Sequence, residues 1–226
     1  MKSHIEEEIN SIKEKVLYMG SLAEEMISLS AKILNERNQE LCSQVLEREE
    51  KINKLQMEID ETGVKILALY QPEATDLRTI MAATKINSEL ERVADQAVNI
   101  AQTSSFHFLK EIPIAPIYEI PKMSSIAQEM VKQSLDAFAK RDVELAKSVL
   151  EKDEELDTLK SKVFEDVLDL VKNSPLKAKQ FIDLILISRN LEKIGDHATN
   201  IAEDVIYMVL GKDIRHHAVW NKKIAR

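Results

Sequence analysis

The sequence predicts an all-α protein of two tandem three-helix bundles that arose by internal duplication. The 226 residues include only four Gly and five Pro, so the chain has few places at which to turn. Aromatic residues make up 4% and charged residues 31%, a balance typical of long amphipathic helices rather than strands. A repeat is the third observation: Glu89–Gln102 and Asn190–Glu203 lie 101 residues apart and match at seven of fourteen positions. Helices of about thirty residues would be about 45 Å long, so we expect an elongated molecule.

Three helices are expected in the first half of the chain. The first covers Glu6–Leu34 and ends at the polar sequence NERNQ. The second covers about Gln39–Tyr70 and ends before Pro72, because proline does not fit into a helix interior. The third opens near Thr75–Asp76, where a short polar side chain can cap free backbone amides, and runs past Gln102.

The segment Leu109–Pro121 is the only place where three prolines fall close together. No helix is expected to run through it. It therefore divides the chain into a first repeat (1–108), a Pro-containing connection (109–121) and a second repeat (122–226).

The second half repeats the pattern of three helices. A helix over about Lys122–Lys140 ends at Arg141–Asp142, and the next ends before the sequence NSPLK. Ser174 as N-cap and Pro175 as first helical residue then predict the start of the last helix. That helix should stop at Gly211, a typical residue after a helix C-terminus.

Helical phase separates a buried seam from a polar flank in both repeats. Apolar residues recur at the three-and-four spacing of a buried face. The seam residues are Ile86, Leu90, Val93, Ala97 and Ile100 in the first repeat, and Ile187, Leu191, Ile194, Ala198 and Ile201 in the second. The flank carries Glu91, Asp95 and Asn99 in the first repeat, and Glu192, Asp196 and Asn200 in the second. On the middle helices Glu49 and Asn53 flank the seam, and their counterparts are Asp153 and Asp157.

Each half thus offers two pairs of oxygen-bearing side chains, one pair from each of two long helices. Side chains four residues apart on a helix are neighbours in space. Carboxylate and amide oxygens suit hard cations such as Mg²⁺, Ca²⁺, Mn²⁺ or oxidised iron, whereas zinc usually also recruits Cys or His. The alternative is that these residues form a solvated helix flank that binds nothing. The residues alone leave both the cation site and the solvated flank open.

Composition and missing motifs exclude several classes of function. The net charge of −8 argues against a nucleic-acid surface, and no apolar run approaches the length of a membrane span. The single Cys42 cannot form an intramolecular disulfide and is expected in the core. There is no phosphate-cradling loop, and none of the five histidines has a Glu three residues before it, as di-iron bundle enzymes require. We therefore expect a soluble protein of a reducing compartment that is not an enzyme.

Two motifs carry a resemblance to a known family. LERVADQAVNIA and LEKIGDHATNIAE, each ending a three-helix unit, resemble the twin Glu/Asp-x-x-x-Asp signatures of the PhoU family, bacterial and archaeal regulators of phosphate uptake. YQPEATDLRTIMAATKINSELERVAD is similar to that family's first repeat, including Asp76-Leu77-Arg78. GKDIRH is similar to the family's usual C-terminus, so the resemblance covers nearly the whole chain in order.

The resemblance implies a cytoplasmic adaptor between the phosphate ABC transporter and a phosphate-sensing histidine kinase. In phosphate-replete cells such an adaptor keeps the kinase from activating phosphate-starvation genes. We also expect a homodimer, with no direct insertion into the membrane and no nucleic-acid partner.

The resemblance also implies metal sites, since some members of the family bind iron or zinc; manganese and magnesium are further candidates. Carried over by match, the ligands are Glu49, Asn53, Glu91 and Asp95 in the first half, and Asp153, Asp157, Glu192 and Asp196 in the second. Asn53 leaves the first set one negative charge short, so the second set is expected to bind more tightly. The competing interpretations are a carboxylate-bridged metal-dependent enzyme and a metal-free helical scaffold.

Overall fold

The chain folds into six long helices and no strands over the residues that the structure describes. The computed structural model describes residues 2–36, 38–105 and 119–215. The helices are α1 (Lys2–Glu36), α2 (Glu40–Tyr70), α3 (Ala74–Thr103), α4 (Glu119–Lys140), α5 (Val143–Asn173) and α6 (Ala178–Leu210), with a 3₁₀ turn, η2 (Pro175–Lys177), before α6. The predicted all-α class is confirmed.

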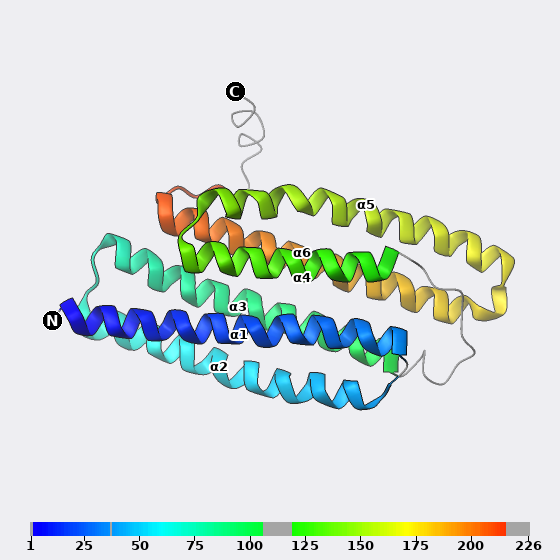
Figure 1. Ribbon diagram of the computed structural model, residues 1–226, viewed down its shortest axis with the longest axis horizontal. Coiled ribbons are helices and arrows are strands. Elements are labelled where there is room, and N and C mark those ends of the chain that lie inside the picture. Colours follow the sequence, from blue (N-terminus) through cyan, green and yellow to red (C-terminus); the bar gives the residue numbers. More distant parts are fainter. Residues whose placement is uncertain (1, 37, 106–118, 216–226) are drawn as a thin grey trace, which may run out of the picture.

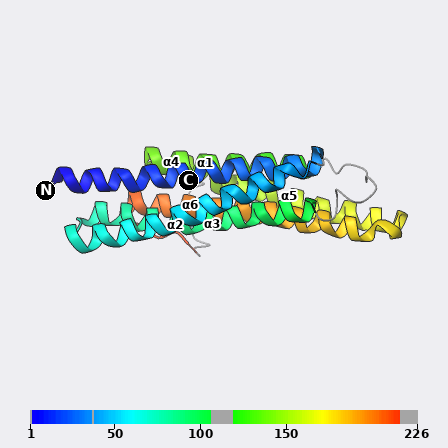
Figure 2. The same ribbon diagram turned by 90° about the horizontal axis from the view of Figure 1, so that it is seen from below.

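Each half is a three-helix bundle, and the two bundles lie side by side (Figure 1). Helices α1, α2 and α3 all pack against one another, as do α4, α5 and α6. The bundles join mainly where α3 packs against α6, with a smaller contact between α1 and α4. All helices run along the long axis, so the molecule is elongated, as Figure 2 shows from a second side. This confirms the predicted duplicated architecture.

The buried core follows the predicted seams. All ten seam residues of α3 and α6 are at most 1% exposed. On α2, Ile52, Ile59 and Ile66 are fully buried. Cys42 is half-buried and packs against the same core, as expected of a small apolar side chain. The flanking acidic residues are consequently held at fixed positions beside a rigid core.

Three predicted helix starts differ from the structure. Helix α1 begins at Lys2 instead of Glu6. Helix α4 begins at Glu119, so Pro121 lies in its first turn instead of in the connection. Proline is tolerated there because the first amides of a helix have no intrahelical partner. Helix α3 begins at Ala74, with Glu73 as an N-cap that makes no side-chain hydrogen bond. Residues 109–118 of the predicted connection lie outside the described part of the chain.

The start of the last helix is also more complex than predicted. Ser174 makes no side-chain capping bond, and Pro175 opens η2 rather than α6. The predicted end of this helix is confirmed, because Gly211 has a φ of 67° and its N–H donates to the carbonyl of Tyr207. The Nε atom of Arg78, on α3, donates to the Met208 carbonyl at 3.2 Å and so ties this end of α6 to the other half.

Hydropathy gives no candidate for a membrane span in the part of the chain that the structure describes. None of the six helices there combines the length and the apolar character that crossing a bilayer requires.

Candidate carboxylate sites in the two halves

The eight predicted site residues form two clusters, one in each bundle. The first cluster is Glu49, Asn53, Glu91 and Asp95, between α2 and α3; the second cluster is Asp153, Asp157, Glu192 and Asp196, between α5 and α6. In both cases the two helices pack directly against each other. Each helix contributes two side chains four residues apart, one turn above the other on the same flank.

The carboxylates of the first cluster are close enough to repel one another. Burial raises the pKa of Glu49, and the negative charges of Asp95, Glu50 and Glu91 raise it further. Burial and the charge of Asp95 likewise raise the pKa of Glu91. Residues from α2 and α3 therefore share one field, although they are about forty positions apart in sequence.

The second cluster shows the same coupling more strongly. Burial raises the pKa of Asp153 to about 6, with further contributions from Asp196, Asp157 and Glu192. Burial also raises the pKa of Asp196, followed by the charges of Glu192 and Asp157. Asp153 on α5 thus lies in the field of the other three predicted residues of this half, two of which belong to α6.

Lys160 is a member of the second site that sequence reasoning missed. Its ammonium lies 2.6 Å from Oε1 of Glu192 and 3.1 Å from Oδ1 of Asp157, and these bonds raise its pKa. The neutral Gln56 is its counterpart in the repeat, at the same offset of 104 residues that relates Asn53 to Asp157. The signal that could have found it is a lysine three residues after Asp157, one turn along the same helix.

Lys160 changes the comparison of charge between the clusters. The second cluster has four carboxylates and the first has three, but one ammonium lies within the second. Both therefore carry a formal charge of −3. The expectation of tighter binding in the second half was based on one extra negative charge, and Lys160 offsets that charge.

Gly195 allows the close approach of α5 and α6 behind the second cluster. A Cβ atom at this position would lie 2.4 Å from Cδ2 of Leu156 and 3.5 Å from Oδ1 of Asp153. Leu156 is fully buried and has little room to move. Its counterpart in the first half, Ala94, is 1% exposed. A small residue in mid-helix is thus explained by packing, as its place in the sequence indicated.

Asn200 and His197 lie on a different interface from the clusters. His197 Nδ1 lies 2.8 Å from Oε2 of Glu89, and the Asn200 amide donates to the same oxygen at 3.1 Å. Burial by itself would raise the pKa of Glu89, but these two hydrogen bonds and the charges of His197 and Arg92 together hold the pKa below its usual value. These residues therefore tie α3 to α6 between the two halves. The contact of His197 with Glu89 was not visible in the sequence, because the two residues lie 108 positions apart in different halves.

The chemistry of the cluster residues favours a metal ion, but the positions of their side chains do not form a closed metal site. Clustered carboxylate oxygens with unrelieved mutual repulsion are the chemistry that a hard cation favours. Among the residues that the structure describes, however, no three His, Cys, Asp or Glu side chains converge closely enough to hold a metal ion. The residues fit a metal by charge and ligand type, and a bound ion would require them to rotate toward it.

Comparison with known proteins matches both halves to one family. The family model described as the PhoU domain matches residues 16–104 and again residues 120–205. The two matched segments coincide with the two helical bundles.

Individual relatives match over nearly the full length. A "Phosphate-specific transport system accessory protein PhoU homolog" from Aquifex aeolicus is 37% identical over 95% of this chain and 97% of the relative. A homolog of the same name from Zymomonas mobilis is 36% identical over 92% of this chain and 88% of the relative. The crystal structure of PhoU from Pseudomonas aeruginosa superposes with a TM-score of 0.88 at 35% identity, over 92% of this chain and 99% of that one.

Proposed function

Because the chain belongs to the PhoU family, we propose that it is an adaptor between a phosphate ABC transporter and a phosphate-sensing histidine kinase. A function related to phosphate transport follows from relatives that are named as accessory proteins of that system. The finer proposal is that it keeps phosphate-starvation genes off when phosphate is plentiful. It would act without catalysis, as a homodimer in the cytoplasm.

The observation that carries this proposal is the match of both bundles and of nearly the whole chain. Two family domains at residues 16–104 and 120–205 leave no room for a separate catalytic domain within the matched length. An elongated body with a carboxylate cluster on each half suits a protein that contacts partners over an extended surface.

Deletion of the gene in its own organism tests the regulatory role. We expect a reporter of phosphate-starvation genes to become active in phosphate-rich medium and to fall silent again when the wild-type gene is restored. A second deletion that removes the kinase should abolish the activation. A reporter that stays silent in the first deletion would refute the negative regulation.

We further propose that the two clusters bind metal ions, with iron, zinc, manganese and magnesium as candidates. Glu49, Asn53, Glu91 and Asp95 would hold one site, and Asp153, Asp157, Glu192 and Asp196 the other. A bound cation would relieve the repulsion that raises the pKa values in both clusters. It would also reduce the net negative charge of each cluster, which is −3 without metal.

Metal content of untagged protein purified without chelator tests this proposal. Mass spectrometry should find a stoichiometric metal that falls by about half in Glu192→Ala/Asp196→Ala and in Glu91→Ala/Asp95→Ala. Circular dichroism of each variant checks that the helices are intact. Protein without metal in all three forms would favour the metal-free helical scaffold, and turnover of a phosphorylated or oxidisable substrate would favour the enzyme.

A further inference from the structure

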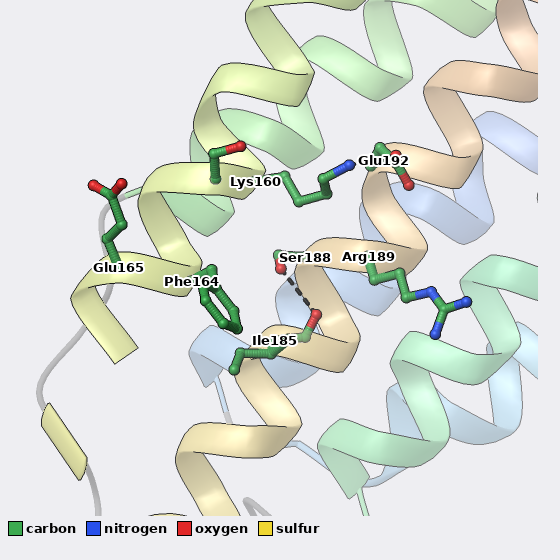
Figure 3. Close-up of a pocket in the computed structure, with 8 residues that line it drawn as sticks. Lys160, Phe164, Glu165, Ile185, Ser188, Arg189 and Glu192 are labelled. Carbon is green, nitrogen blue, oxygen red and sulfur yellow. Dashed lines mark hydrogen bonds and ion pairs between the residues drawn. The ribbon is translucent and has the colours of Figure 1, made fainter. Parts of the chain in front are cut away.

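The α5–α6 groove contains a pocket that the carboxylate cluster does not account for. Its volume is about 400 Å³, and it lies beside the second cluster. Figure 3 shows Phe164 of α5 and Ile185 of α6 turned toward each other in it, while Glu165 points away. The lining residues are Lys160, Ser161, Phe164, Glu165, Ile185, Ser188, Arg189 and Glu192. The floor is apolar and one end is charged.

The pocket reflects a divergence between the two repeats. In the first half Asn87 spans from α3 to α2, and its amide donates to the Gln56 carbonyl and to Oδ1 of Asp60, both at 3.0 Å. Its counterpart Ser188 is shorter, and its hydroxyl donates to the Ile185 carbonyl of its own helix at 2.9 Å. Phe164 stands where the first half has Asp60. The second half has therefore lost a polar bridge and gained an apolar opening.

Exposed apolar side chains extend this opening toward the end of the bundle. Phe164 is 49% exposed although an aromatic ring gains much from burial. Leu168 lies one turn further along α5, and Ile182 and Leu186 lie on α6. All three are more than 40% exposed. Together with Phe164 and Ile185, these three residues form what we call the apolar strip, on the two helices that flank the pocket. Exposed apolar side chains gathered in one region are typical of a protein contact.

Charge and spacing define what could cover the apolar strip. Asp157 lies seven residues before Phe164 on α5, and Glu192 lies seven residues after Ile185 on α6. Seven residues are two helical turns, or about 10 Å. Because the helices are antiparallel, both carboxylates lie at the same end of the groove, where the cluster retains a net negative charge in spite of Lys160.

We propose that the α5–α6 groove binds an amphipathic helix of a partner protein, with an apolar side chain in the pocket and a basic side chain two turns away on the carboxylates. This mode of recognition places an apolar helix face in a groove, and opposite charges set its direction. The inference rests on the proposed adaptor function, and it names the surface that meets the transporter or the kinase.

Other occupants fit this groove less well. A second copy of the chain would place one acidic cluster against another if the same faces met, and the whole chain carries a charge of −8. An anionic membrane surface would be repelled by the same carboxylates. A basic helix would not be repelled by the carboxylates.

A divalent cation would use the same carboxylates, so excess Mn²⁺ should weaken the binding of the partner helix.

The test measures binding to the purified phosphate transporter and to the cytoplasmic part of the kinase by biolayer interferometry. The variant Phe164→Asp/Ser188→Asn copies the polar bridge of the first half, so it should fold and close the pocket. We expect its affinity for one of the two partners to fall at least about tenfold. Val64→Asp, at a 67% exposed apolar position on α2, is the matched control and should bind like wild type.

A photo-crosslinking amino acid at position 164 then identifies the occupant. The captured peptide should come from a helix that carries Lys or Arg two turns from a large apolar residue. If the double variant binds with the same affinity as wild type, the α5–α6 groove is not the binding surface, although the proposed adaptor function still stands. If the double variant no longer dimerises, the occupant of the groove is a second copy of this chain and not a helix of a partner protein. Wild type that binds neither protein would overturn the proposed adaptor function together with this inference.

Discussion

The two halves share a core and differ in the groove beside it. Ile86 and Ile187 are equivalent and equally buried. One position further, Asn87 joins two helices by hydrogen bonds, whereas Ser188 leaves a pocket. Close packing penalises changes of volume in a core, but a flank tolerates them. The duplication thus preserved the scaffold and left its outer grooves free to take different roles.

The carboxylate clusters reach the same formal charge in two ways. The first replaces one carboxylate with Asn53, and the second keeps four carboxylates and adds Lys160. The amide oxygen of Asn53 can act as a metal ligand, whereas the ammonium of Lys160 cannot and would have to move away from the carboxylates when a metal ion binds. The halves should therefore differ in how they respond to metal, and the following variants test that difference and the packing behind it.

The largest effect is expected at Gly195, where the first half has Ala94 at the equivalent position. Gly195→Ala would force a Cβ atom against fully buried Leu156, which should cost about 2 kcal/mol of unfolding free energy. Urea denaturation followed by circular dichroism measures it. The matched change Ala94→Gly should cost at least about 1 kcal/mol, through lower helix propensity and the loss of a buried methyl group. A Gly195→Ala variant as stable as wild type would show that Leu156 can move aside.

An exchange of the residues that distinguish the clusters should change the metal affinities of the two sites in opposite directions. Lys160→Gln removes the internal ammonium and should tighten Mn²⁺ binding in the second half by about tenfold, or about 1.4 kcal/mol. Gln56→Lys should weaken the first site by a similar factor. Isothermal titration calorimetry on metal-stripped protein measures both. Lys162→Gln, which removes a lysine paired with Glu119 instead, is the control. No change in Lys160→Gln would mean that this lysine is not a competitor.

A smaller effect is expected where the two middle helices begin. Asp142 caps α5, accepting hydrogen bonds from the amides of Glu144 and Leu145 at 3.0 Å. Asp142→Ala should therefore cost about 1 kcal/mol of unfolding free energy. Gln39 makes no such bond at the start of α2, so Gln39→Ala should change little. Thermal unfolding measures both, and equal losses would contradict the assigned cap.

The smallest effect concerns Asp153 and depends on pH. The pKa of this carboxyl is about 6 in the folded protein, above its ordinary value of 3.8, so the folded state holds its proton longer than the unfolded state. Metal-free protein should lose stability as pH rises from about 4 to about 6. Asp153→Asn should then stabilise it at pH 7 by at most about 1 kcal/mol, because solvent screens a half-exposed carboxyl.

Urea unfolding with chelator at both ends of this range measures the Asp153 effect. The stabilisation should decrease as pH falls toward 4 and be absent by about pH 3, where the wild-type carboxyl is protonated in both states. Glu165→Gln, at an exposed carboxylate of the same helix, is the control and should show no such dependence. A stabilisation of equal size at both pH values would assign the gain to something other than the proton.

The candidate site was predictable in its position but not in its composition. Helical phase placed Glu91, Asp95, Glu192 and Asp196 beside the seam, and the structure has them there because phase depends only on residues of one helix. Lys160 was missed because its partner Glu192 lies on another helix. His197 was missed for the same reason, since Glu89 belongs to the other half.

The sequence by itself determined the number of helices, their buried faces and the duplication, because hydrophobic periodicity and chain breaks are local properties. It placed Pro121 in the connection although this residue lies in the first turn of α4, and it did not show that Pro175 opens a 3₁₀ turn before α6. A proline fits at such a helix start because the first backbone amides there have no intrahelical partner. Only the tertiary structure decided how α3 meets α6, how Lys160 enters the second cluster and that the α5–α6 groove is open. Those features depend on the relative rotation and axial shift of packed helices, which side chains distant in sequence set together.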